Sequence, residues 1–329
     1  MSEQQSEQQE VIKGYRLVRP LGKGGMGTVF VVEKLSTHEL YAMKFLVDEL
    51  AEEEQYGARF AREIEALRSI RHPHVVDIFD WSLGSRPGEK SFIVMELLEG
   101  EGLDALLRRE KTLSPSLAMR IMLQVLDALG TAHRVAVLHR DIGPSNIILL
   151  RKRSLPGRPP QFHVKLLDFG LAKSTAGGDA SFDVTQAGSL MGKPPYVPPE
   201  VFRGQRTDER SDIFACGILL YRMVTGRLPY RETQGQLLWV ERFNTKDDAV
   251  EYPPPREFAP QISPALDAII ARAVRKSADD RYQTAEEMQV DLLAIEQDDE
   301  AGVGSLSRPP LPLPVPRETA GGDSARTAS

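Results

Sequence analysis

The amino-acid sequence predicts an α+β fold in which a small antiparallel sheet with one main helix precedes a larger, mostly helical part. Three observations predict it. Strand-like segments dominate residues 13–98, one helical stretch interrupts them at residues 49–70, and apolar residues recur at helical spacing from about residue 115 onward. With 329 residues, the chain is long enough for one large domain or for two lobes with separate cores.

The first strands surround a turn that is rich in glycine. We expect strands at residues 15–21, 30–33 and 40–46, and the glycines lie at residues 22–27, between the first two strands. The order is therefore strand, turn, strand. A dinucleotide-binding fold or a P-loop would instead lead from the turn into a helix.

One helix and two further strands complete the first part. Phe60, Ile64 and Leu67 form an apolar stripe at helical spacing, Glu63 lies beside that stripe, and Pro73 ends the helix. Strand-like segments follow at residues 75–81 and 91–96.

The later part is predicted to be helical. Ser114 and Pro115 are a typical cap and first residue for a helix that continues to about His133. Further helices are expected at residues 211–225, 234–243, 263–274 and 285–295. Residues 151–163 and 171–198 are predicted to be loops, and a loop as long as the second is usually functional or disordered.

Composition excludes several classes of protein. The net charge of −6 gives no sign of nucleic-acid binding, and no apolar run approaches the 18 residues of a membrane span. Cys216 is the single cysteine, so no intramolecular disulfide can form, and its apolar surroundings favour a buried structural thiol. The first ten residues lack the apolar stretch of a signal peptide, so we expect a cytoplasmic protein.

Acidic and amide side chains recur in a fixed order near the middle of the chain. Within His139–Asn146, Asn146 follows Asp141 by five residues, and an Asp-Phe-Gly triplet begins 22 residues later at Asp168. Either pattern alone arises by chance in loops. Both together, in this order and each beside a short apolar strand, resemble the catalytic loop and the metal-binding triplet of protein kinases. The Gly-rich turn and the segments around residues 62–76 resemble bacterial serine/threonine kinases of eukaryotic (Hanks) type.

The resemblance implies a two-lobed fold that holds ATP and Mg²⁺, with Mn²⁺ as an alternative metal. Asp141 would accept the proton of the substrate hydroxyl, and Asn146 and Asp168 would bind the metal. Lys44 would contact the α- and β-phosphates, held there by an ion pair with Glu63. On their own, Lys44 would be a strand lysine facing solvent and Glu63 a plain charge on a helix.

The nucleotide site is expected between the two lobes. Glycines at three positions of the turn would let backbone N–H groups cover the phosphates, although this pattern alone is a weak signal. The resemblance places Met95 at the back of the adenine pocket and residues 96–98 at the hinge. The full set of predicted nucleotide-binding residues is Leu21, Gly22, Gly24, Gly27, Val29, Ala42, Lys44, Met95, Glu96, Leu98 and Ile148.

The predicted boundaries follow from these patterns. We expect disordered tails at residues 1–12 and 297–329, and a kinase domain at residues 13–296 with a small lobe at 13–98 and a large lobe at 99–296. The C-terminal tail is Pro-rich, so it is either a spacer or a ligand for a Pro-binding partner. The expected partners are protein substrates, and a transient homodimer remains an alternative. Neither nucleic acid nor a membrane span is expected.

Two positions depart from the family pattern. Serine/threonine kinases carry lysine where this chain has Gly143, and threonine where it has Lys193, 50 residues later. One hypothesis is that Lys193 restores the positive charge near the γ-phosphate. The alternatives are a weakly active enzyme, a pseudokinase that acts as a nucleotide-binding scaffold and, as a weaker option, a small-molecule kinase.

The resemblance also indicates regulatory and scaffold residues. Arg140 before the predicted base suggests control by phosphorylation, for which Thr185 is the first candidate and Ser189 the second. In the large lobe, Arg281 would pair with Glu200, and Asp212 would brace the catalytic loop.

Overall fold

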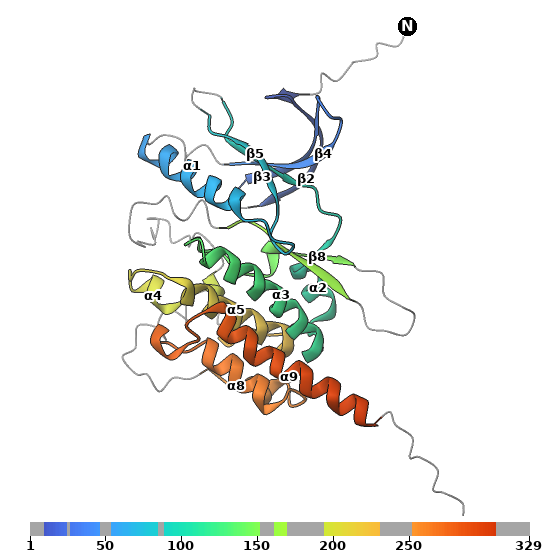
Figure 1. The fold of residues 1–329 in the computed structure, drawn as a ribbon, viewed down its shortest axis with the longest axis vertical. Coiled ribbons are helices and arrows are strands. Elements are labelled where there is room, and N and C mark those ends of the chain that lie inside the picture. Colours follow the sequence, from blue (N-terminus) through green and yellow to red (C-terminus); the bar gives the residue numbers. More distant parts are fainter. Residues whose placement is uncertain are drawn as a thin grey trace, which may run out of the picture.

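The computed structural model describes residues 10–24, 27–46, 54–84, 89–151, 161–169, 194–230 and 252–306. Over these residues the predicted α+β architecture with two lobes is confirmed (Figure 1). The small lobe is an antiparallel six-stranded sheet in the order β1-β2-β3-β4-β6-β5, and α1 packs beside β5. Its elements are β1 Val11–Ile12, β2 Tyr15–Gly24, β3 Gly27–Lys34, β4 Leu40–Phe45, α1 Glu54–Ser69, β5 Ile78–Ser82 and β6 Phe92–Glu96.

The large lobe is built from helices and a three-stranded sheet in the order β7-β8-β9. Its strands are β7 Glu101–Gly102, β8 Ile147–Arg151 and β9 Phe162–Leu166. Its α-helices are α2 Leu103–Glu110, α3 Pro115–His133, α4 Pro199–Phe202, α5 Glu209–Thr225, α7 Pro255–Phe258, α8 Pro264–Ala273 and α9 Ala285–Leu306. Three 3-10 turns accompany them, at Pro144–Asn146, Pro194–Tyr196 and Ala278–Asp280.

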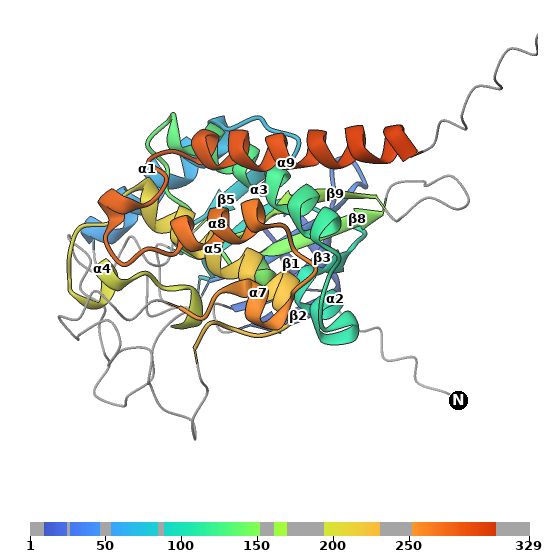
Figure 2. The ribbon, with the colours of Figure 1, turned by 90° about the horizontal axis from the view of Figure 1, so that it is seen from below.

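Local capping explains where the central helices begin and end. The Ser114 side chain accepts a hydrogen bond from the backbone N–H of Leu117 at 3.3 Å, and Pro115 occupies the first turn of α3, as the sequence predicts. Asp208 caps α5 in the same way, and Gly226, with φ of 74°, ends it. α5 is buried along most of its length, and α9 packs against α3 and α8 (Figure 2).

One hydrophobic cluster runs through both lobes. It joins α1 and β5 of the small lobe to α3, α5, α8 and α9 of the large lobe. The catalytic-loop residue Ile142 and the triplet residue Phe169 belong to this cluster, so the core itself holds the predicted site in place.

The structure differs from the sequence prediction at both ends. Val11–Ile12, predicted to lie in a disordered tail, form a strand that pairs with β2. α9 continues to Leu306 instead of ending near residue 295, because no proline interrupts the chain before Pro309. Residues 307–329 and the helix predicted at 234–243 lie outside the described residues.

The sequence prediction also missed α2 and β7. α2 has eight residues, and Gly102, which precedes it, offers no capping side chain. A helix this short has too few turns for its apolar spacing to stand out.

In the part of the chain that the structure describes, no helix is both long and apolar enough to cross a bilayer.

Candidate active site

The backbone of the catalytic loop is held by Asp212 of α5. Its two carboxylate oxygens accept hydrogen bonds from the backbone N–H groups of His139 and Arg140, each at 2.8 Å. His133 of α3 donates a further bond from Nε2 to Asp212 at 2.9 Å. Burial raises the pKa of the Asp212 carboxyl, but the His133 hydrogen bond and the neighbouring imidazoles outweigh burial and lower it. The predicted bracing of this loop by Asp212 is confirmed.

Asp141 and Asn146 are joined directly. The Asn146 side-chain amide donates to the Asp141 backbone oxygen at 2.9 Å and to Asp141 Oδ2 at 2.7 Å. Both residues are buried. The three-residue 3-10 turn at Pro144–Asn146 folds the amide back onto the carboxylate.

Gly143 precedes this turn with an extended backbone, at φ 172° and ψ 167°. Any residue can adopt that conformation, so the backbone does not require glycine here. The local backbone conformation is therefore compatible with lysine.

A backbone hydrogen bond places Asp168 next to the Asp141–Asn146 pair. The N–H of Leu167 donates to the Asn146 backbone oxygen at 2.8 Å, which places the start of the triplet against the catalytic loop. Asp168 itself has a positive φ of 50°. Such a value is uncommon outside glycine and is frequent at functional sites.

Lys44 forms an ion pair with Asp168, at 2.8 Å between Nζ and Oδ2. Among the described residues, Asp168 and not Glu63 is the carboxylate that pairs with Lys44, so the predicted Lys44–Glu63 ion pair is not formed in this structure. Lys44 lies on β4 opposite Val29 of β3 and Ile93 of β6. The sheet thus presents its ammonium to the triplet across the boundary between the lobes.

The glycines of the turn differ in what requires them. Gly27 has φ of 132°, and a Cβ there would overlap the carbonyl oxygen of Phe45. Gly22 pairs with Val29, and a Cβ there would meet nothing within 4 Å. The fold therefore demands glycine at position 27, whereas the space around position 22 would admit a side chain.

The residues predicted for adenine lie on strands of the small lobe, on the segment that follows β6 and on β8 of the large lobe. Ala42 pairs with Met95 across β4 and β6, and Ile148 lies on β8 in the large lobe. A Cβ at Gly100 would approach Ile148 Cγ2 at 2.7 Å, so this glycine lets the connecting segment pass close to β8. Leu21 is 43% exposed at the edge of the sheet.

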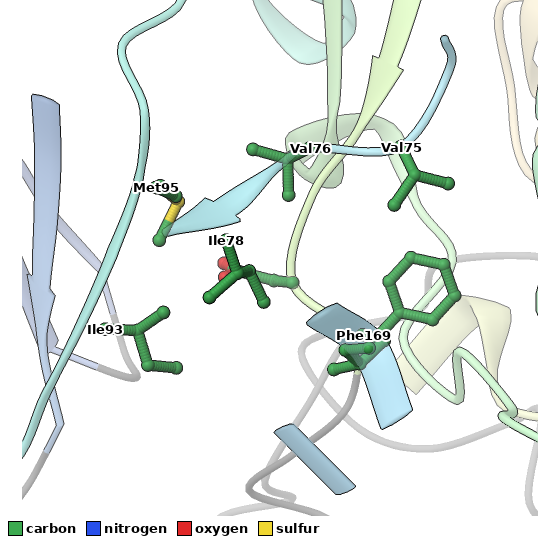
Figure 3. A pocket seen from close by; sticks show the side chains of 8 residues that line it. Val75, Val76, Ile78, Ile93, Met95 and Phe169 are labelled. Atoms are coloured by element: carbon green, nitrogen blue, oxygen red, sulfur yellow. The ribbon is translucent and has the colours of Figure 1, made fainter. Parts of the chain in front are cut away.

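A small apolar pocket lies behind Met95. Figure 3 shows Met95 and Ile93 on one side and Phe169 on the other. Phe169 also packs on His139, with 4.6 Å between ring centroids. The full lining is Leu67, Val75, Val76, Ile78, Ile93, Met95, Asp168 and Phe169. The pocket adjoins the Lys44–Asp168 pair through Asp168.

Glu200 and Arg281 form the predicted buried ion pair of the large lobe. The two guanidinium NH groups of Arg281 donate to the two Glu200 oxygens at 2.9 and 2.8 Å. Ser211 donates to the same carboxylate at 2.7 Å. Burial raises the pKa of Glu200, but the charge-assisted bonds outweigh burial and lower it.

Some predicted residues cannot be placed, and one polar contact was not foreseen. Lys193, Thr185 and Ser189 lie outside the described residues. The side chains of residues 23–26, around Gly24, are not described either. Sequence reasoning missed Lys165, which is buried in β9 and binds Glu96 of the hinge at 2.5 Å. A charged residue inside an apolar strand run was the available signal.

Comparison with known proteins agrees with this geometry. The family model for the protein kinase domain matches residues 15–293. The chain belongs to the protein kinase family. Among curated proteins, serine/threonine-protein kinase pkn3 of Myxococcus xanthus is 36% identical over 312 residues, which cover 93% of this chain and 55% of that protein. Serine/threonine-protein kinase PknB of Mycolicibacterium smegmatis is 33% identical over 284 residues, covering 86% of this kinase chain and 43% of that protein.

A solved structure agrees with the fold. The crystal structure of the Mycobacterium tuberculosis PknI kinase domain has a TM-score of 0.64 at 24% identity, covering 87% of this chain and 98% of that one. The resemblance to bacterial kinases of eukaryotic type is thus confirmed. The chain spans about half the length of the curated relatives it matches, 55% and 43% in the two cases above.

The described residues suit the metal that this family uses. Asp168 offers a carboxylate and Asn146 an amide oxygen, and a hard cation such as Mg²⁺ prefers oxygen donors. No cluster of three or more His, Cys, Asp or Glu side chains that could hold a metal occurs within the described ranges. Phosphate oxygens would therefore have to complete the coordination.

Proposed function

We propose that the chain is an ATP-dependent protein kinase that transfers the γ-phosphoryl group to serine or threonine hydroxyls of protein substrates. The observation that carries the proposal is the hydrogen bond from Asn146 to Asp141, on a loop fixed by Asp212, beside the Lys44–Asp168 pair. The names of the curated relatives support it. Cytoplasmic location and protein substrates are part of this proposal.

Each residue has a role that its surroundings allow. The Asn146 amide holds the Asp141 carboxylate in one orientation, and that carboxylate would accept the proton of a substrate hydroxyl. Lys44 would exchange Asp168 for the α- and β-phosphates when nucleotide enters. Asn146 and Asp168 would hold Mg²⁺, which neutralises charge on the phosphates when bound.

The test is phosphate transfer from labelled ATP to the chain itself and to a generic acceptor protein, with Mg²⁺ or Mn²⁺. Asp141→Asn keeps the size of the side chain and removes the base. We expect it to lower the rate by about 10²-fold or more. Equal rates for the variant and the parent chain would contradict the role of Asp141.

The chain has Gly143 where serine/threonine kinases carry a lysine, so another residue would have to supply that positive charge. We propose that Lys193 supplies the cation that Gly143 lacks, because the two positions are expected to touch and a lysine acts at phosphate as a point charge. The extended backbone at Gly143 would accept the family lysine without strain. We therefore expect Lys193→Ala to slow transfer by about 10²-fold.

A double variant that exchanges both residues tests the relocation of the charge more directly. Gly143→Lys combined with Lys193→Thr should restore the rate that Lys193→Ala loses. If Lys193→Ala leaves transfer unchanged, or the double exchange stays as slow as the single variant, the relocation is wrong.

A pseudokinase that binds nucleotide and signals by conformation is the second candidate. Gly143 favours this candidate. The ion pair between Lys44 and Asp168 favours it too, since the predicted partner of Lys44 was Glu63. Nucleotide binding measured by thermal shift, without transfer of label under any metal, would select this candidate over the first.

Activation by phosphorylation is part of the first proposal. Thr185 is the expected primary site and Ser189 the secondary one. Intact-mass measurement and peptide mapping of the purified chain, beside Asp141→Asn as the inactive control, test both positions. Absence of phosphate at both sites in an active preparation would remove this part.

A further inference from the structure

The segment between α1 and β5 joins the two lobes through β9. Leu166 of β9 donates its N–H to the His74 backbone oxygen at 2.8 Å and accepts from Val76 N–H at 3.0 Å. Val75 forms an isolated parallel bridge with the same residue. Asp168 lies two residues after Leu166. A shift of this segment would therefore move the start of the Asp168 triplet.

Three of the six histidines in the chain lie together in this joint, with their rings tilted against one another. The His74 ring lies between the other two, with centroids 5.5 Å from His72 and 4.6 Å from His163 of β9. We call His72, His74 and His163 the histidine stack. All three come from elements that the interlobe joint connects.

Hydrogen bonds define the neutral form of each ring. His74 Nδ1 donates to the Val164 backbone oxygen at 2.9 Å, and His163 Nε2 donates to the Pro73 oxygen at 2.9 Å. Each of these two rings therefore has one remaining nitrogen that can take a second proton. His72 Nδ1 instead accepts from the His74 backbone N–H at 3.2 Å.

Protonation of His74 would leave its bond to the Val164 oxygen in place but would put a positive charge beside the other two imidazoles.

We propose that the histidine stack is a proton-sensitive positioning device: neutral His74 keeps the joint that leads to Asp168 in place, and protonation of His74 loosens that joint. This inference rests on the proposed kinase function for its catalytic consequence. Its structural consequence, a joint that loosens in mild acid, does not depend on that function.

The charged groups that surround the stack do not cancel the effect. On α3, Asp127 binds His72 Nε2 at 3.2 Å and is the acidic group that favours the charged form of His74. In the joint itself, Arg71 and Asp77 pair with each other at 2.9 Å. On β9, Lys165 is paired with Glu96. Among the described residues, the half-exposed Asp127 carboxylate thus acts on both His72 and His74.

The pKa direction of His74 agrees with this geometry. Burial lowers its pKa below 6.5, the other two imidazoles lower it further, and the Val164 bond and Asp127 act in the opposite sense without reversing it. A histidine whose pKa is lowered on folding binds fewer protons in the folded chain than in the unfolded chain. Its contribution to stability is present above pH 6.5 and is lost as the pH falls below that value.

Two variants each replace one imidazole of the stack with a side-chain amide and keep the hydrogen bond that the neutral ring donates. The amide of asparagine can replace His74 Nδ1, so His74→Asn preserves the donor to Val164. The longer glutamine can replace His163 Nε2, so His163→Gln preserves the donor to Pro73. His38→Gln is the matched control, because His38 is exposed on the small lobe and pairs only with Glu33 in the part of the chain that is described.

The experiment compares melting temperature and the rate of phosphate transfer at pH 7.5 and pH 5.8 for the parent chain and the three variants. We expect the parent chain and His38→Gln to lose Tm and rate together in acid. The variants His74→Asn and His163→Gln should lose roughly 2–4 °C less Tm and should flatten the pH profile of kcat. Equal acid losses in all four proteins would overturn the proposal.

A measurement on the unsubstituted chain guards against variants that fold poorly. Imidazole NMR resonances should show one stack histidine titrating below the ordinary value of 6.5. A stack that titrates at or above that value would overturn the proposal. Since Tm and NMR need no turnover, an inactive chain would contradict the kinase function while leaving this inference tested.

Discussion

Gly22 and Gly27 lie on one Gly-rich turn, yet different physical causes require them. At Gly27 the positive φ of 132° and the nearby Phe45 carbonyl leave no room for a side chain. At Gly22 the space around a Cβ is open. A motif search treats these positions alike. In the structure, folding requires glycine at position 27, whereas position 22 has room for a side chain.

The prediction at this scale is a pair of substitutions. Gly27→Ala should lower the melting temperature, since it introduces both backbone strain and overlap, at a cost of about 1–3 kcal/mol. Gly22→Ala should leave the melting temperature unchanged and raise the KM for ATP. Thermal unfolding and steady-state kinetics on both variants check this. A stable Gly27→Ala protein would contradict the assignment of that glycine to folding.

At the scale of elements, α5 organises the large lobe around two buried charges. Asp212 in its first turns holds the catalytic loop, and Arg281 reaches back from the segment before α9 to bind Glu200 of α4. The Arg281 side chain is fully buried, so removing it would leave the Glu200 carboxylate without its counter-charge.

Arg281→Met should therefore lower the free energy of unfolding by about 3–5 kcal/mol. Arg108→Met is the control, because Arg108 pairs with Asp104 on the exposed face of α2 and should cost less than about 1 kcal/mol. Urea unfolding of both variants measures the difference. Similar losses would mean that the buried pair contributes no more than a surface pair.

At the scale of the whole molecule, a core shared by both lobes couples the site to global stability. The cluster that holds Ile142 and Phe169 continues through the helices of the large lobe. Its polar supports, Asp212 and Glu200, are carboxylates whose pKa values are lowered in the folded chain.

The lowered pKa values of Asp212 and Glu200 predict how unfolding depends on pH. A carboxylate with a lowered pKa stabilises the fold above its unfolded value, here 3.8 for Asp212 and 4.5 for Glu200, and loses that contribution as the pH falls through the folded value. We expect Tm to fall steeply below pH 4.5, and the fall to be smaller in Glu200→Gln, which is already destabilised at pH 7. Identical acid slopes for both proteins would contradict the role of Glu200.

The sequence by itself determined the family and most of the elements, and it predicted roles for Asp141, Asn146 and Asp168, because these follow from local spacing. It also predicted the Asp212 and Glu200–Arg281 contacts through the resemblance. It did not predict the full extent of α9, since the end of a helix depends on weak local preferences as well as on packing.

Only the tertiary structure decided which carboxylate pairs with Lys44 and which histidines meet. Lys44 and Asp168 are 124 residues apart, and His74 and His163 are 89 residues apart. Side-chain spacing along the chain carries no information about such pairs, because their distance is set by how β9 packs against the segment after α1. The same tertiary packing bonds the His74 backbone to Leu166, two residues before the predicted metal ligand Asp168.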